Sequence, residues 1–258
     1  MDSTVPAGAA ILLAFIRATE TGRGDASAYD TVYAHKEGRL PRKLTSMTLG
    51  EIVDAQKAWP KNFGSSAAGA YQFMRTTLIG LSKELGLRGD QIFDAAFQDR
   101  LGFHLLKRRG YEDFMAGKIS RTEFGKRLAQ EWASFPVLAP TQGGSRKVTR
   151  GQSYYAGDGL NKALVKPEVV EALLDKVKAA AAQPSLAPHP HAQPVEVPAA
   201  GEGRLPQPWL HHDGPDTSTL SPAAPSVMSR LLTSILSILK RIRSEEHTSE
   251  LQSHSDLV

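Results

Sequence analysis

Apolar residues recur at helical spacing through most of residues 1–182. An unbroken apolar run at residues 9–16 has the length and composition of a buried helix, and we expect this helix to extend to Glu20. The same spacing, with capping and helix-breaking residues at the ends, predicts further helices at residues 48–59, 70–85, 91–109, 120–135 and 166–182.

Two of these helices begin with the sequence of a capping box. Thr48 is followed three residues later by Glu51, and Ser120 is followed by Glu123. Pro60 is expected to end the first of them, because proline disrupts a helix interior. These signals fix where the helices start better than the apolar pattern alone.

A short β element is predicted after the first helix. Tyr29, Val32 and Tyr33 favour strands and stand in a polar, glycine-containing stretch at residues 21–40, which we interpret as a small hairpin. The expected fold class for residues 1–182 is therefore α+β, mainly α, in a single domain.

Beyond residue 182 the composition changes. Residues 183–225 are rich in Pro, Ala and His and predict a disordered linker, in which the four histidines are not taken as a metal site. Residues 226–242 are amphipathic and basic, suited to contact with a membrane surface or a partner. Residues 243–258 resemble a translated sequencing adapter, so they are left out of the reasoning, and the natural carboxyl terminus is expected to differ.

Charge and cysteine content narrow the function classes. The formal charge is +4, and leaving out residues 243–258 removes one of 31 basic and four of 27 acidic residues, which raises it to +7. An anionic wall polymer would attract such a chain, and we expect the basic runs 107–109, 126–127 and 146–147 to contribute. No nucleic-acid-binding motif is present. Cysteine is absent, which excludes disulfides and thiolate metal sites, and no metal or cofactor is expected.

Glu20 is the candidate catalyst. It follows an apolar helix and precedes a glycine-rich turn, so its side chain is expected beside an apolar wall. A carboxyl group in such a place tends to keep its proton, which a general acid needs at neutral pH.

Three segments taken together indicate a family. They are the Glu20 region with Tyr-Asp-Thr-Val-Tyr at residues 29–33, Ser-Ser-Ala-Ala-Gly-Ala-Tyr-Gln-Phe at 65–73, and Glu-Trp-Ala-Ser-Phe-Pro at 131–136. Their order resembles the lambda-type phage endolysins of the lysozyme-like superfamily, glycoside hydrolase family 104, over residues 9–178. Ala70 stands where that family usually has Arg, which puts any substrate contact of that Arg in doubt.

The resemblance implies a lysozyme-like, two-lobed fold and peptidoglycan glycan strands as substrate. The family's catalytic acid falls on Glu20, its hairpin Tyr-Asp on Tyr29 and Asp30, and its Tyr-Gln on Tyr71 and Gln72. Asp30 is counted with the substrate-binding residues, although hydrogen bonds that hold the hairpin are the role we expect of it.

A groove for the polysaccharide is also expected. Tyr29, Tyr33, Tyr71 and Trp132 are candidates for faces that contact sugar rings, although Trp132 also fits a core position. Hydrogen bonds to the N-acetyl groups are expected from three polar residues, Gln72, Ser65 and Ser66.

Two mechanisms fit this set. A hydrolase uses a second carboxylate to activate water or to stabilise the cation, whereas a lytic transglycosylase lets the C6 hydroxyl of the sugar attack, so one Glu is enough. Asp25, Asp30 and Glu37 are the nearby acids, and none has the spacing of a second catalytic carboxylate. Transglycosylation is favoured. A hydrolytic muramidase and a non-catalytic wall-binding or virion protein remain the alternatives.

The expected place of action is the bacterial cell wall. The amino terminus lacks the pattern of a cleavable signal, so we expect synthesis in the host cytoplasm, holin-type release and action in the periplasm, as a monomer.

Overall fold

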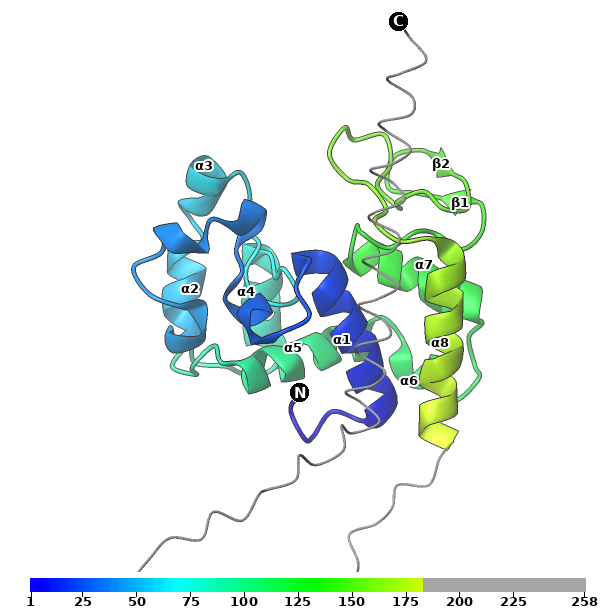
Figure 1. The fold of residues 1–258 in the computed structure, drawn as a ribbon, viewed down its shortest axis with the longest axis horizontal. Coiled ribbons are helices and arrows are strands. Elements are labelled where there is room, and N and C mark those ends of the chain that lie inside the picture. Colours follow the sequence, from blue (N-terminus) through cyan, green and yellow to red (C-terminus); the bar gives the residue numbers. More distant parts are fainter. Residues whose placement is uncertain (183–258) are drawn as a thin grey trace, which may run out of the picture.

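The structure is a computed structural model, and it describes residues 1–182. Figure 1 shows two groups of helices on either side of a central pair. The expectations for 183–225, 226–242 and 243–258 lie outside the described residues. The eight α-helices in the described part are α1 (Ala7–Thr21), α2 (Leu49–Ala55), α3 (Trp59–Phe63), α4 (Arg75–Glu84), α5 (Ala95–Arg108), α6 (Tyr111–Met115), α7 (Arg121–Glu131) and α8 (Pro167–Ala182).

The central pair is α1 and α5. In Figure 1, α2, α3 and α4 lie to one side of it, while α6, α7 and α8 lie to the other. The helices α1 and α8 pack along each other, and α5 contacts both α1 and α6. No helix within residues 1–182 is long and apolar enough to cross a membrane.

Helix α1 is buried on nearly every side, as its apolar sequence predicts. Leu12, Leu13 and Ile16 are completely buried. At Gly8, an added Cβ would lie 2.8 Å from the Val177 carbonyl oxygen, so only glycine permits this approach of α1 to α8. The helix ends at Gly22, whose left-handed backbone lets its N–H bond to the Ala18 carbonyl. Glu20 is thereby placed in the last turn of a rigid, buried helix.

The predicted hairpin after α1 is wrong. Residues 21–40 form short 3₁₀ turns at Ala26–Asp30, Tyr33–His35 and Glu37–Arg39. Asp25 starts the first turn by accepting a hydrogen bond from the Ser27 N–H, and this local bond competes with strand pairing. A single antiparallel bridge between Val32 and Ala68 is the β feature found there.

The small sheet lies elsewhere. Strands β1 (Thr141–Gln142) and β2 (Lys147–Val148) pair antiparallel, with Thr141 opposite Val148. The part of the chain that the structure describes is thus a mainly helical domain with a two-stranded antiparallel sheet. The class was predicted, but the position of the strands was not.

The helix boundaries show how well the capping signals worked. Thr48 and Glu51 form the predicted capping box in full. Ser120 accepts the Glu123 N–H, but the Glu123 carboxylate contacts Arg127, at 2.8 Å, and Lys126, so the second box forms only in part.

Four helices differ from their predicted extents, and one of them, predicted at residues 91–109, begins only at Ala95, where the Asp94 side chain caps it. The segment 48–59 ends at Ala55, and Pro60 lies in the first turn of the separate helix α3, a position where its missing N–H costs nothing. Helix α4 starts at Arg75 because Gln72, three residues earlier, has a left-handed φ of 48°. Helix α7 ends at Glu131, which leaves the following Trp-Ala-Ser-Phe-Pro segment free to cross towards α1.

Candidate functional site

The Glu20 carboxylate is half-buried at the end of α1. Burial raises its pKa from the ordinary value of 4.5 to about 7, and a hydrogen bond from the Ser134 hydroxyl opposes part of that rise. None of the ion pairs within residues 1–182 includes Glu20. At neutral pH this group therefore carries a proton in a large fraction of the molecules, which suits a general acid.

The turn after Glu20 is held in place by side chains. The Thr21 hydroxyl donates to the Arg17 carbonyl at 2.7 Å and accepts the Arg23 N–H at 3.1 Å. Arg23 then donates to the Thr31 hydroxyl at 3.0 Å and to Glu37 at 2.7 Å. These bonds connect the end of α1 to the segment that carries Tyr33.

Sequence reasoning missed Ser134, the residue whose hydroxyl contacts the candidate acid. It lies 114 positions after Glu20 and donates its hydroxyl hydrogen to the Glu20 carboxylate. The Trp-Ala-Ser-Phe-Pro motif was recognised, but attention went to Trp132. A serine next to a recognised aromatic was the available signal, although its partner could be known only from the fold.

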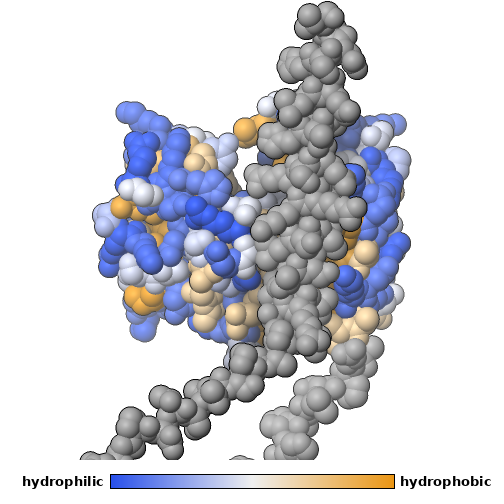
Figure 2. Space-filling view, in the orientation of Figure 1, coloured by the Kyte–Doolittle hydropathy of each residue, from blue (hydrophilic) through white to orange (hydrophobic). Residues whose placement is uncertain are grey.

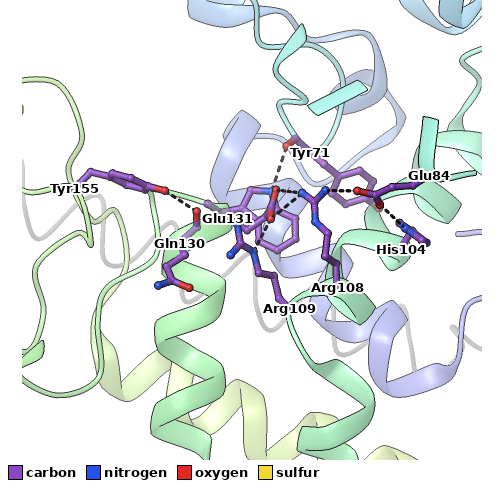
Figure 3. A network of polar contacts seen from close by, with 9 residues as sticks. Tyr71, Glu84, His104, Arg108, Arg109, Gln130, Glu131 and Tyr155 are labelled. Carbon is purple, nitrogen blue, oxygen red and sulfur yellow. Dashed lines mark hydrogen bonds and ion pairs between the residues drawn. The ribbon is translucent and has the colours of Figure 1, made fainter. Parts of the chain in front are cut away.

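Three sets of contacts hold the segment around Ser134 in place, and Figure 3 shows the ion pairs of Glu131 among them. Arg109 donates to Glu131 at 2.6 Å, and Arg108 joins the same carboxylate to Glu84. The Trp132 indole N–H donates to the Tyr71 carbonyl at 3.2 Å. In the third set, the Leu164 N–H donates to the Ser134 carbonyl at 2.8 Å.

Tyr71 and Trp132 do not present their rings to solvent. Tyr71 is 1% exposed and Trp132 is 3% exposed. The Tyr71 and Tyr29 hydroxyls donate to the buried Asp99 carboxylate at 2.6 and 2.9 Å, and Tyr29 also accepts from Arg17. The rings of Tyr29 and Tyr71 therefore lie in a buried network, because each hydroxyl finds its partner on α1 or α5 rather than in water.

The remaining predicted residues divide by exposure. Tyr33 is 39% exposed, whereas Ser66 is buried and accepts the Arg75 N–H at 3.2 Å. Gln72 is half-buried and donates to the Gly69 carbonyl at 2.8 Å. Asp30 accepts the Thr45 N–H at 2.9 Å, so its observed contact holds the backbone in place.

A backbone hydrogen bond joins the segment that carries Gln72 to the segment that carries Tyr33. The Gly69 N–H donates to the Thr31 carbonyl at 2.8 Å, which places the segment with Gln72 beside the segment with Tyr33. Since Arg23 also bonds to Thr31, both segments are tied to the turn after Glu20. Within residues 1–182, no three His, Asp or Glu side chains are arranged to hold a metal ion.

The fold is mainly helical, and a half-buried acid with a pKa raised to about 7 stands at the end of its buried helix α1. The family model named Endolysin matches residues 12–160, more than half of the 258 residues, and the chain belongs to the Endolysin family. No curated protein and no solved structure matches the chain. Membership of this family assigns the chain to peptidoglycan degradation in phage-type lysis, with the bacterial cell wall as its substrate.

Proposed function

We propose that the protein cleaves the β-1,4 bond between N-acetylmuramic acid and N-acetylglucosamine as a lytic transglycosylase of the lambda type, with Glu20 as its single catalytic acid. The observation that carries the proposal is the half-buried Glu20 carboxyl, whose pKa burial raises to about 7 and which contacts a hydroxyl and no cation. The two groups of helices flanking α1 and α5 fit a lysozyme-like, two-lobed domain.

The chemistry needs one proton that is given and then taken back. Protonated Glu20 donates to the bridging oxygen as the bond from that oxygen to the muramic C1 breaks, which releases the N-acetylglucosamine 4-hydroxyl. The ionised Glu20 then accepts the proton of the muramic C6 hydroxyl while that oxygen bonds to C1. The product is a 1,6-anhydro ring, and Glu20 regains its proton.

Ser134 has a defined part in this cycle. Its hydroxyl donates to the Glu20 carboxylate, a bond that favours the ionised form present between the two steps. The desolvation of Glu20 favours the protonated form that starts the cycle. The balance keeps both forms accessible near neutral pH.

The nearby acids support a mechanism with one carboxylate. Asp25 caps the turn at Ser27, Asp30 bonds to the Thr45 N–H, and Glu37 pairs with Arg23 at 2.7 Å. Each is engaged in holding backbone or a cation. A second carboxylate available to activate water, as in a hydrolase, is not among these three.

Product analysis tests the proposal. Purified sacculi digested by the protein should give muropeptides with 1,6-anhydro-muramic ends, which borohydride does not reduce. Reducible muramic ends would show a hydrolytic muramidase instead. Intact glycan strands, together with bound protein, would show a wall-binding protein without turnover.

A further inference from the structure

Four of the seven cations in the basic runs 107–109, 126–127 and 146–147 are paired with acids in the fold. Arg108 and Arg109 pair with Glu131, at 3.4 and 2.6 Å, and Arg108 also contacts Glu84. In α7, Lys126 and Arg127 pair with Glu123. Lys107, Arg146 and Lys147 have no acidic partner within residues 1–182, and cations outside these runs add to the charge that can attract an anionic partner.

A second group of cations has no acidic partner. Lys36, Arg39 and Lys61 form no ion pair with any acid within residues 1–182. The one acid in their segment, Glu37, is held by Arg23. Together with Tyr33, we call these three cations the Tyr33 surface. Figure 2 shows mostly hydrophilic residues over the part of the molecule that contains α2 and α3.

Two of the cations are held in position. The Lys36 ammonium donates to the Phe63 carbonyl at 3.1 Å, and the Arg39 guanidinium donates to the Asn62 carbonyl at 3.2 Å. Arg39 also lies 5.4 Å from the centre of the Phe63 ring. An ammonium has three donors and a guanidinium has five, so donors remain for a ligand.

The Tyr33 surface adjoins the turn that follows Glu20. Arg23, three residues after Glu20, pairs with Glu37, which lies between Lys36 and Arg39 in the chain. Tyr33 is exposed and lies close to Gly64, where an added Cβ would come within 3.3 Å of its ring. The cations therefore lie beside an exposed aromatic ring, and the Arg23–Glu37 ion pair connects their segment to the turn after Glu20.

The charges of the proposed substrate show what these cations would meet. In a glycan strand with its peptides attached, both sugars are uncharged, because the lactyl carboxyl of each muramic acid is amide-linked to a peptide. The fixed negative charges are the carboxylates of those peptides. Cations beside a sugar-binding site therefore face the peptides rather than the sugars.

We propose that the Tyr33 surface binds the carboxylates of the peptide stems, so that the protein prefers glycan that carries peptides. This proposal rests on the proposed function, since it takes peptidoglycan as the bound polymer. Lys36 and Arg39 supply the charge, and Tyr33 supplies an apolar face for the stem or the adjoining sugar.

The test is a sedimentation assay of binding, made in the Glu20→Gln background so that no glycan is cut. Lys36→Gln with Arg39→Gln is compared with Lys83→Gln with Arg88→Gln. The second pair loses the same charge from two exposed positions, Lys83 in α4 and Arg88, which pairs with Asp90. Both are measured on sacculi freed of phosphate polymers and on the same sacculi after carbodiimide amidation of their carboxylates.

The first pair should weaken binding to native sacculi by about fivefold or more at low salt, and less as salt screens the charges. It should bind amidated sacculi like the Glu20→Gln parent, while the control pair matches the parent on both. Equal loss on native and amidated sacculi, or no loss on either, would overturn the proposal.

The assay is independent of glycosidic cleavage. Failure of the product analysis to find 1,6-anhydro-muramic ends would reject the proposed function and leave this binding result standing. Circular dichroism and thermal melting check that both double variants are folded. This check is needed because Lys36 and Arg39 also donate hydrogen bonds to backbone carbonyls.

Discussion

Two glutamates at the carboxyl ends of helices lie close to the segment that carries Ser134, and their carboxylates have different partners. Glu20 lies in the last turn of α1 and Glu131 is the last residue of α7. Glu131 has a side chain only 8% exposed and is paired with Arg108 and Arg109. Glu20 is half-buried and receives one hydroxyl hydrogen, from Ser134.

The difference lies in the cations. A carboxylate that accepts charge-assisted hydrogen bonds from two guanidinium groups serves to join helices. A carboxylate moved out of water without a cation has its pKa raised, so it holds a proton that it can give away. The same residue type at similar helix ends thus yields a structural anchor in one place and a candidate acid in the other.

The largest expected stability change is at the anchor. Glu131→Gln removes the charge that compensates Arg108 and Arg109, and we expect it to lower the free energy of unfolding by about 1–3 kcal/mol. Urea denaturation measures this loss. Glu123→Gln is the control, because its pairs with Lys126 and Arg127 are more exposed and should contribute less than about 1 kcal/mol. Equal losses of unfolding free energy at Glu131 and Glu123 would show that the buried pair contributes no more than the exposed one.

A change of opposite sign is expected at Glu20. Its pKa is higher in the folded protein, about 7, than the ordinary 4.5, so between these pH values the folded state binds more protons than the unfolded state. Stability contributed by this group is therefore present below about pH 4.5, is lost as pH rises towards 7, and stays level above.

Glu20→Gln should accordingly be more stable than the wild type at pH 8, by roughly 1–2 kcal/mol, and equal to it at pH 4. Urea denaturation at the two pH values checks this. A variant less stable than the wild type at pH 8 would show that the ionised carboxylate is well solvated or paired.

The smallest effect is expected at Ser134. Its hydroxyl lowers the pKa of Glu20, so Ser134→Ala should raise that pKa. Since the protonated acid is the active form, kcat/KM in the wild type should fall as pH rises above about 7. In Ser134→Ala this fall should begin at higher pH. The pH profile of kcat/KM is measured on soluble labelled peptidoglycan. An identical profile in Ser134→Ala and the wild type would show that Ser134 does not affect the ionisation of Glu20.

The helices could be predicted because their signals are local. The apolar run of α1 and the Thr48 to Glu51 capping box each depend on neighbours within a few residues, and both are found. The hairpin at residues 29–33 could not be judged locally. The Tyr29 hydroxyl bonds to Asp99, 70 positions away, and Asp25 caps a 3₁₀ turn in the same segment.

The site shows the same limit. Burial of Glu20 followed from the apolar helix before it, which is a local signal. The approach of Ser134, 114 positions later, depends on Trp132 bonding to Tyr71 and on Glu131 bonding to α5. Likewise, the acids that pair with Arg108 and Arg109 come from α4 and α7, so a basic run in the sequence is a poor guide to free charge.

The central claim is that Glu20 is the acid of glycan cleavage. Rates of peptidoglycan solubilisation by Glu20→Gln and Glu131→Gln, each per folded molecule, test it most directly. We expect Glu20→Gln to lose about 10²–10⁴-fold in rate and Glu131→Gln to keep most of its activity. Wild-type rates in Glu20→Gln would contradict the account.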